Sequence, residues 1–287
     1  MPVRYLAAVA AVSGVCLTPA AAEPVASAAP GAHTGPEAIQ LAAIRRGHAP
    51  VPAQVQRDMP AVLASKARAA ERKRVFLKTV LPAVLRANAR IRQERRFLAH
   101  VAGRRAAGQA LDAPARRKLA RLARRYETEP DELAALRRRV DIVPPSLALA
   151  QAAIESGWGS SRFAQKANAL FGQRVYGCSD CGIKPRGYDS DPGFRVRRFP
   201  TVMASVRAYM DNLNTHPAYR AFRTQRRHAR RAGLALDGHD LAGTLTRYSE
   251  RREAYVRDVR RTIAANDLTE FDGARLVRHA APRRAAR

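Results

Sequence analysis

The stretch PPSLALAQAAIESGWGSSRFAQKANALFG, residues 144–172, constrains the fold of this chain most strongly. It begins with two prolines, which suit the first turn of a helix because the N–H groups there have no intrahelical partner. Leu147, Ala150 and Ile154 follow at the spacing of one buried helical face. Two glycines that flank a tryptophan then stop the helix. The pattern predicts a short, mostly apolar helix with Glu155 in its last turn.

Glu155 is a candidate general acid because of its position in this predicted helix. It lies close to Trp158, the only tryptophan in the chain. The negative end of the helix dipole and an apolar setting both disfavour a charged carboxylate, so we expect a raised pKa. A carboxylic acid that stays protonated near neutral pH can act as the acid in glycoside cleavage. The alternative interpretation is a surface glutamate near a helix end.

The run AQAAIESGWGSSRFAQKANALFG resembles the signature of the bacterial β-N-acetylglucosaminidases of glycoside hydrolase family 73, in particular their Bax-like branch. The similarity extends from about residue 71 to about residue 265. It includes VFLKTVLPAVLRAN upstream and SVRAYMDNLNTHPAYRAFR downstream. The resemblance implies a mainly α, lysozyme-like α+β domain that hydrolyses the β-1,4 bond after N-acetylglucosamine in peptidoglycan. In this family the glutamate that corresponds to Glu155 is the catalytic acid.

The resemblance also implies residues of the sugar-binding cleft. Asn168 and the aromatic Phe171 become candidate substrate contacts, and an Asn amide suits an N-acetyl group. Trp158 is expected to brace the cleft. From the residues alone, Phe171 and Trp158 are equally well explained as packing residues of the core.

The segment LTRYSERREAYVRDV, residues 245–259, resembles the paired-tyrosine stretch of the family. Tyr248 matches the tyrosine near the reacting sugar, where its hydroxyl would assist catalysis by positioning water or the N-acetyl group. Tyr255 is a second candidate substrate contact. It also shares a helical face with Val259 and Ile263, which favours packing against the core. In this chain SER replaces the alanine–threonine–aspartate turn of the family.

Residues 175–199 are rich in Gly, Asp, Pro and Cys and predict a small β-hairpin lobe beside the cleft. The lobe holds the local candidates for a second carboxylate, which are Asp180, Asp189 and Asp191. The Asp-x-Asp-Pro-Gly pattern is also ordinary turn chemistry, and this interpretation is favoured. Substrate assistance by the 2-acetamido group of the sugar would remove the need for a second acid.

Cys178 and Cys181 are the two cysteines that follow the N-terminal segment. A single CxxC is poor evidence for a zinc site, which needs four ligands. In an exported protein a local disulfide is the favoured state. No metal or organic cofactor is implied, because the chain has no HExxH, GxSxG or phosphate-cradling glycine motif.

The N-terminus predicts export to the periplasm or the exterior. A short charged region, an apolar run and the small-residue site Ala20-Ala21-Ala22 are typical of a signal peptide. The remaining organisation is predicted from composition and helical periodicity, and Pro82 is expected to break or restart a helix. The expected parts are a signal peptide (1–22), a disordered linker (23–60), a basic N-terminal helical extension (61–140), the glucosaminidase domain (141–265) and a basic, mobile tail (266–287).

The net charge of +28 attracts polyanions. Only six of the 52 basic residues are lysines. For an exported protein, anionic polymers of the cell envelope are nearer partners than nucleic acid, and no transmembrane span is expected in the mature chain. A nucleic-acid binder would explain the charge but neither the signal peptide nor the motif, and two further alternatives to the hydrolase remain at this point. They are a lytic transglycosylase or muramidase of the related fold, and a non-catalytic, basic wall-binding protein.

Overall fold

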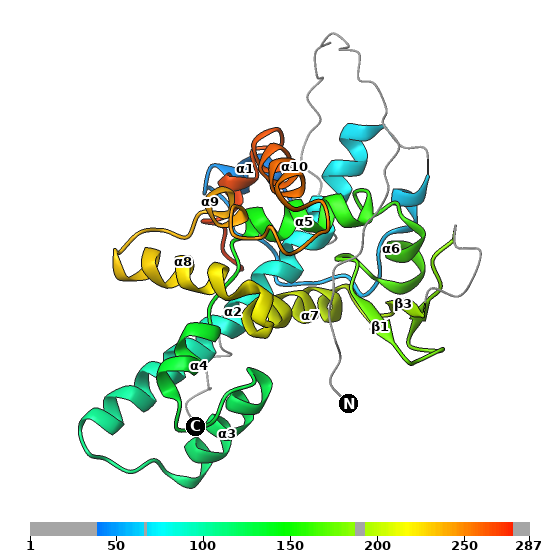
Figure 1. The fold of residues 1–287 in the computed structure, drawn as a ribbon. Helices are drawn as coiled ribbons and strands as arrows, with labels where there is room; N and C mark the ends of the chain where they lie inside the picture. Colours follow the sequence, from blue (N-terminus) through cyan, green and yellow to red (C-terminus); the bar gives the residue numbers. More distant parts are fainter. Residues whose placement is uncertain (1–38, 66–67, 187–192, 278–287) are drawn as a thin grey trace, which may run out of the picture.

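The computed structural model describes residues 39–65, 68–186 and 193–277. Within these ranges the chain is mainly helical with one small antiparallel sheet (Figure 1), which confirms the expected fold class. The α-helices are α1 (Leu41–Arg45), α2 (Ala69–Ala106), α3 (Ala113–Arg125), α4 (Leu133–Arg139), α5 (Pro145–Ser156), α6 (Arg162–Ala167), α7 (Val202–Thr215), α8 (Arg220–Arg231), α9 (Gly238–Ala242) and α10 (Arg252–Ala264). Short 3₁₀ turns are η2 (Ala61–Ala64), η3 (Pro217–Tyr219) and η4 (Leu268–Phe271).

Helix α5 is the centre of the fold. Ten of its 12 residues are buried, although the sequence pattern indicated only one buried face. Helices α2, α9 and α10 and the turn η4 all pack against it. Close approach is possible because its side chains are mostly small. A Cβ on Gly238 of α9, for example, would come within 2.1 Å of the Ser146 hydroxyl.

The N-terminus of α5 is capped from the far end of the chain. The Asp272 carboxylate accepts hydrogen bonds from the Ser146 backbone N–H and from the Ser146 hydroxyl, both at 2.7 Å. These bonds satisfy a helix-start N–H that would otherwise be buried without a partner, and a carboxylate is favoured at this end of the helix dipole. The predicted mobile tail (266–287) is therefore wrong for residues 266–277. Residues 278–287 lie outside the described ranges.

The predicted disordered linker (23–60) is wrong for residues 39–60. Ile44 and Val51 are buried in the core, and the backbone of Val51 exchanges hydrogen bonds with Arg275 and Val277. Scattered apolar residues without a regular period can still be buried when they dock on a preformed surface, so composition did not predict this segment. Residues 1–38 lie outside the described ranges, and with them the predicted signal peptide.

Helix α2 continues through Pro82, so the predicted break at this residue is wrong. Residues 79–85 are buried, and α2 packs on both α5 and α7. This apolar packing offsets the loss of one backbone hydrogen bond at the proline. The first half of α2 is consequently part of the central core. Side chains from both sides of the predicted boundary at residue 140 pack in one core, so the extension and the glucosaminidase domain are not separate units.

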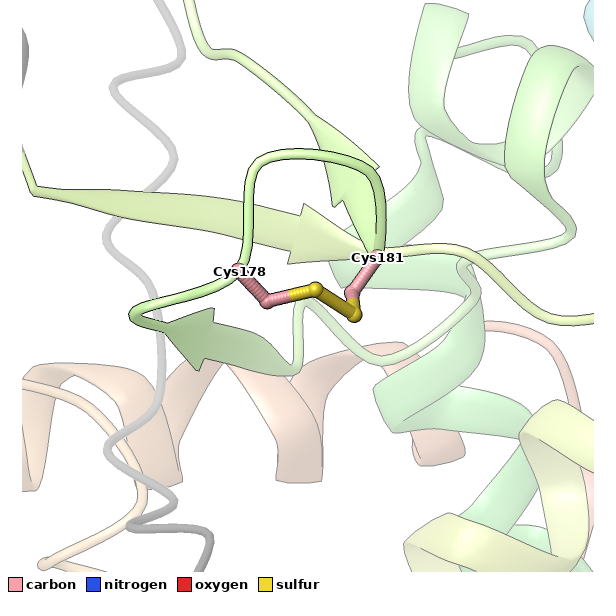
Figure 2. Close-up of a disulfide and its surroundings, with 2 residues drawn as sticks. All are labelled: Cys178 and Cys181. Carbon is pink, nitrogen blue, oxygen red and sulfur yellow. A yellow bond between two sulfur atoms is a disulfide. The ribbon is translucent and has the colours of Figure 1, made fainter.

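The small sheet has the strand order β1-β3-β2, with β1 at Arg174–Tyr176, β2 at Gly182–Ile183 and β3 at Phe194–Arg197. Both outer strands are antiparallel to β3. The turn between β1 and β2 is closed by a disulfide between Cys178 and Cys181 (Figure 2), whose Cα atoms are 5.6 Å apart. The predicted hairpin lobe is thus a three-stranded sheet. No helix in the described ranges is long and apolar enough to cross a bilayer.

A buried ion cluster fixes the segment that leads into α5. Asp141 is 3% exposed and lies 3.2 Å from guanidinium nitrogens of Arg95 and Arg230. The fully buried Arg226 lies 3.8 Å from the same carboxylate and donates to the backbone carbonyls of residues 138, 139, 141 and 142. One carboxylate thereby holds α2, α8 and the α4–α5 connection together.

We expect Asp141→Asn to lower the free energy of unfolding by about 3 kcal/mol or more, because it leaves Arg226 buried without a counter-charge. Urea denaturation measures this. The matched control is Asp240→Asn on α9, whose side chain is 73% exposed and which should change stability by less than about 0.5 kcal/mol. Equal effects of the two substitutions would contradict the assigned role of the cluster.

Candidate active site

The chain turns sharply directly after Glu155. Gly157, Trp158 and Gly159 all have positive φ angles, of 57°, 55° and 79°. Glycine adopts this conformation without strain. At Gly159 a second constraint applies, since a Cβ there would come within 2.6 Å of Met59. The Gly-Trp-Gly sequence therefore ends α5 tightly and leaves Glu155 in its last turn, as predicted.

Trp158 is partly exposed and packs against α2. Its ring meets Phe76 edge-on at 5.4 Å, and the Lys73 ammonium lies 5.2 Å from the ring centroid. These contacts anchor the turn to α2 next to Glu155. A direct contact between Trp158 and substrate stays a prediction.

A chain of hydrogen bonds leads from the core to Glu155. The Tyr209 hydroxyl donates to the Gln151 side-chain oxygen at 2.7 Å, and the Gln151 amide nitrogen donates to the Tyr255 hydroxyl at 2.9 Å. Because the amide nitrogen can only donate, the Tyr255 oxygen accepts from it and its own proton is directed to another group. That group is the Glu155 carboxylate, to which Tyr255 is hydrogen-bonded. All three hydroxyl and amide donors in this series of hydrogen bonds therefore point toward Glu155.

Burial raises the pKa of Glu155 to about 7. The hydrogen bond from Tyr255 and the positive charge of Arg251 oppose this by lowering the pKa, but the burial effect is larger. The direction agrees with the expectation from sequence, whereas the dominant cause is loss of solvent. Near neutral pH the group is thus divided between the acid and the carboxylate.

Tyr248 lies directly behind Tyr255. The two rings are stacked with centroids 5.4 Å apart, and Tyr248 is 2% exposed. The Tyr248 hydroxyl donates to the backbone carbonyl of Phe171 at 3.2 Å. The tyrosine that reaches Glu155 is thus Tyr255, for which core packing was favoured, while a role of Tyr248 at the sugar stays a prediction.

The other predicted contacts are engaged inside the protein. Phe171 is 1% exposed and stacks on Tyr209 at 3.9 Å. The Asn168 side chain accepts from the Met59 N–H and donates to the Asp58 carboxylate and the Phe199 carbonyl. Asn168 also ends α6 with a positive φ of 50°. In this structure both residues support the wall around α5, and substrate contacts by them stay predictions.

Sequence reasoning assigned no functional role to Gln151 or to Tyr209. A signal for Gln151 was present, because it precedes Glu155 by four residues and so lies on the same helical face. Gln151 is also the one amide side chain of this buried helix, and its oxygen and nitrogen both need hydrogen-bond partners. For Tyr209 the sequence carries no comparable signal, because a tyrosine beside an apolar stripe is typical of a core.

The candidate second carboxylates are only partly described. Asp180 is exposed in the disulfide-closed turn, and Asp189 and Asp191 lie outside the described residues. Among the described residues, no other carboxylate contributes to the pKa of Glu155. Within the same ranges, no group of three His, Cys, Asp or Glu side chains is arranged to hold a metal ion.

Comparisons with known proteins agree with this geometry. The family described as mannosyl-glycoprotein endo-beta-N-acetylglucosaminidase matches residues 131–268, which contain α5 and both tyrosines. Protein bax of Escherichia coli strain K12 is 36% identical over 210 residues, or 68% of this chain and 72% of that protein. No solved structure gives a significant match.

We expect Tyr255→Phe to raise the pKa of Glu155 by about one unit, since a lost hydrogen bond to a charged group corresponds to roughly 1.5 kcal/mol. The measurement is a ¹³C NMR titration of glutamate side-chain carbons, with the Glu155→Gln variant identifying the signal. Tyr248→Phe is the matched control, because its hydroxyl bonds to the Phe171 carbonyl instead, and it should leave this pKa unchanged. An unchanged pKa in the Tyr255→Phe variant would refute the assigned contact.

Proposed function

The chain belongs to the Bax-like branch of the glucosaminidase family, and we propose that it hydrolyses the β-1,4 bond after N-acetylglucosamine in peptidoglycan, with Glu155 as general acid. The family is one of glycosidases, which supports a glycan substrate. The observation that carries the proposal is a single partly buried carboxyl group with a pKa of about 7, held by Tyr255 at the end of α5.

The surroundings of Glu155 suit both of its states in such a reaction. Burial favours the neutral acid, which protonates the departing glycosidic oxygen. After the proton has left, the carboxylate keeps the hydrogen bond from Tyr255 and the attraction of Arg251. Tyr209 and Gln151 fix the position of the Tyr255 hydroxyl, so it does not have to reorient when Glu155 becomes charged.

A second group must stabilise or attack the sugar cation on the opposite face. We propose that the 2-acetamido group of the substrate does this, because no other described carboxylate acts on Glu155 and the Asp-x-Asp-Pro-Gly sequence is typical of a turn. A lone acid is also the minimum that a lytic transglycosylase needs, so the chemical form of the product must distinguish the two reactions.

The site of action that fits this proposal is the cell wall. We propose export by the signal peptide at residues 1–22, with the mature chain acting in the periplasm or outside the cell. The strongly basic composition agrees with a partner that carries negative charge.

We expect digestion of purified peptidoglycan by the protein to release glycans with reducing-end N-acetylglucosamine, measured by mass spectrometry. The Glu155→Gln variant should be slower by about 10²- to 10⁴-fold, because it removes the proton donor. The matched control is Glu250→Gln, which changes an exposed glutamate and should keep nearly full activity. Thermal melting establishes that the variants are folded.

Three other outcomes would change the assignment. Anhydro-muramic ends would identify a lytic transglycosylase, and a reducing end at N-acetylmuramic acid would identify a muramidase. Absence of cleavage by the folded parent protein would leave a wall-binding protein.

We expect the double variant Asp189→Asn/Asp191→Asn to keep activity within about threefold of the parent, because substrate assistance needs no second carboxylate. Initial rates on the same peptidoglycan measure this. A loss approaching that of Glu155→Gln would instead place the catalytic base in the lobe and refute substrate assistance.

A further inference from the structure

Helices α4 and α8 pack against each other, and a concave pocket lies between them. Its volume is about 330 Å³. Five arginines line it, two from α4 and three from α8, and Thr215 and Thr224 add hydroxyl groups. The arginines are Arg138, Arg139, Arg220, Arg223 and Arg227. No acidic side chain is among the described residues that line the pocket.

These positive charges are only partly balanced by the protein. Arg139 lies 3.8 Å from the Glu127 carboxylate and donates to two backbone carbonyls. Arg223 also donates to two backbone carbonyls. For the side chains of Arg138, Arg220 and Arg227, no hydrogen bond or ion pair to the described part of the chain is found. The Nε of Arg227 is buried without a hydrogen-bond partner within the same described ranges. A buried guanidinium donor is stabilised by an acceptor, which a bound anion in this pocket can supply.

The crowding of like charges is visible at Arg223. Burial, together with the charges of Arg139, Arg220 and Arg138, lowers the pKa of Arg223 to about 10, and Glu127 alone opposes this. Guanidinium groups that repel one another in this way are stabilised by a bound anion. The planar guanidinium fork also matches the oxygens of phosphate and carboxylate groups in a bidentate geometry.

We propose that this pocket binds a phosphate group carried by a sugar or a lipid headgroup of the cell envelope. Five guanidiniums around a small volume favour a compact anion with more than one negative charge, which fits a phosphate monoester better than a carboxylate. The volume is at the lower end of small-ligand sites and accommodates a phosphorylated sugar.

A second hollow adjoins this pocket. It shares Pro217, Arg220 and Thr224 with the pocket and ends at Arg247, the residue before Tyr248. The charges of Arg247 and Glu155 both influence the pKa of Tyr219, which precedes α8. A phosphate bound at α4 and α8 would therefore hold the protein to the envelope with this face toward its glycans.

The test compares two double variants with the same loss of charge. Arg220→Gln/Arg227→Gln changes the pocket, and Arg117→Gln/Arg121→Gln changes two exposed arginines of α3. The full chain is titrated with glucose 1-phosphate by calorimetry, and with phosphatidic acid and phosphatidylcholine vesicles by co-sedimentation, because both phosphate probes are monoesters. We expect the pocket variant to weaken binding of the phosphate probe by at least tenfold and the α3 variant by less than twofold.

The two probes distinguish the source of the phosphate. Pocket-dependent binding of glucose 1-phosphate indicates a sugar phosphate, and pocket-dependent binding of phosphatidic acid vesicles alone indicates a lipid headgroup. Equal losses in both variants would show unspecific attraction by the net charge, and absence of binding to either probe would also overturn the proposal. The same titrations with the Glu155→Gln variant should give unchanged affinities, so failure of this proposal is separable from failure of the proposed hydrolysis.

Discussion

The burial of α5 is the constraint on which the other features of the structure depend. A helix without a solvent-facing side must have its end groups and its polar side chains satisfied by the protein. Asp272 satisfies the start of α5, and the Gly-Trp-Gly turn closes its end. Gln151, in the middle, is satisfied by Tyr209 and Tyr255. Tyr255, which accepts from Gln151, in turn donates its own proton to Glu155.

The segments that bury α5 come from distant parts of the sequence. Helix α2 and the turn η4 enclose it from positions more than 100 residues apart along the chain (Figure 1). The N-terminal segment around Val51 is joined to residues 275–277 by backbone hydrogen bonds. The fold therefore closes around α5 with both ends of the described chain on the same side of the core. A division into extension, domain and tail would separate segments that are hydrogen-bonded to each other in the folded protein.

The sequence predicted features that local chemistry controls. The end of α5 follows from Gly157 and Gly159, and the small lobe follows from its turn residues. Features that depend on tertiary contact were not predictable in the same way. Pro82 interrupts a helix by local rules, yet α2 is continuous because α5 and α7 pack around it. The choice of Tyr255 over Tyr248 as the partner of Glu155 is likewise made by packing, whereas the resemblance assigned the catalytic position to Tyr248.

The raised pKa of Glu155 is notable in a chain with a net charge of +28. Positive surroundings favour the carboxylate, and Arg251 acts in that direction, yet burial outweighs both. The raised pKa of Glu155 thus results from exclusion of water rather than from nearby negative charge. Any substitution that opens the wall made by Trp158, Tyr248 and Tyr255 should then lower the pKa of Glu155, because solvent and the positive field would both stabilise the charged form. Packing residues around α5 therefore control the pKa of Glu155 by excluding water from it.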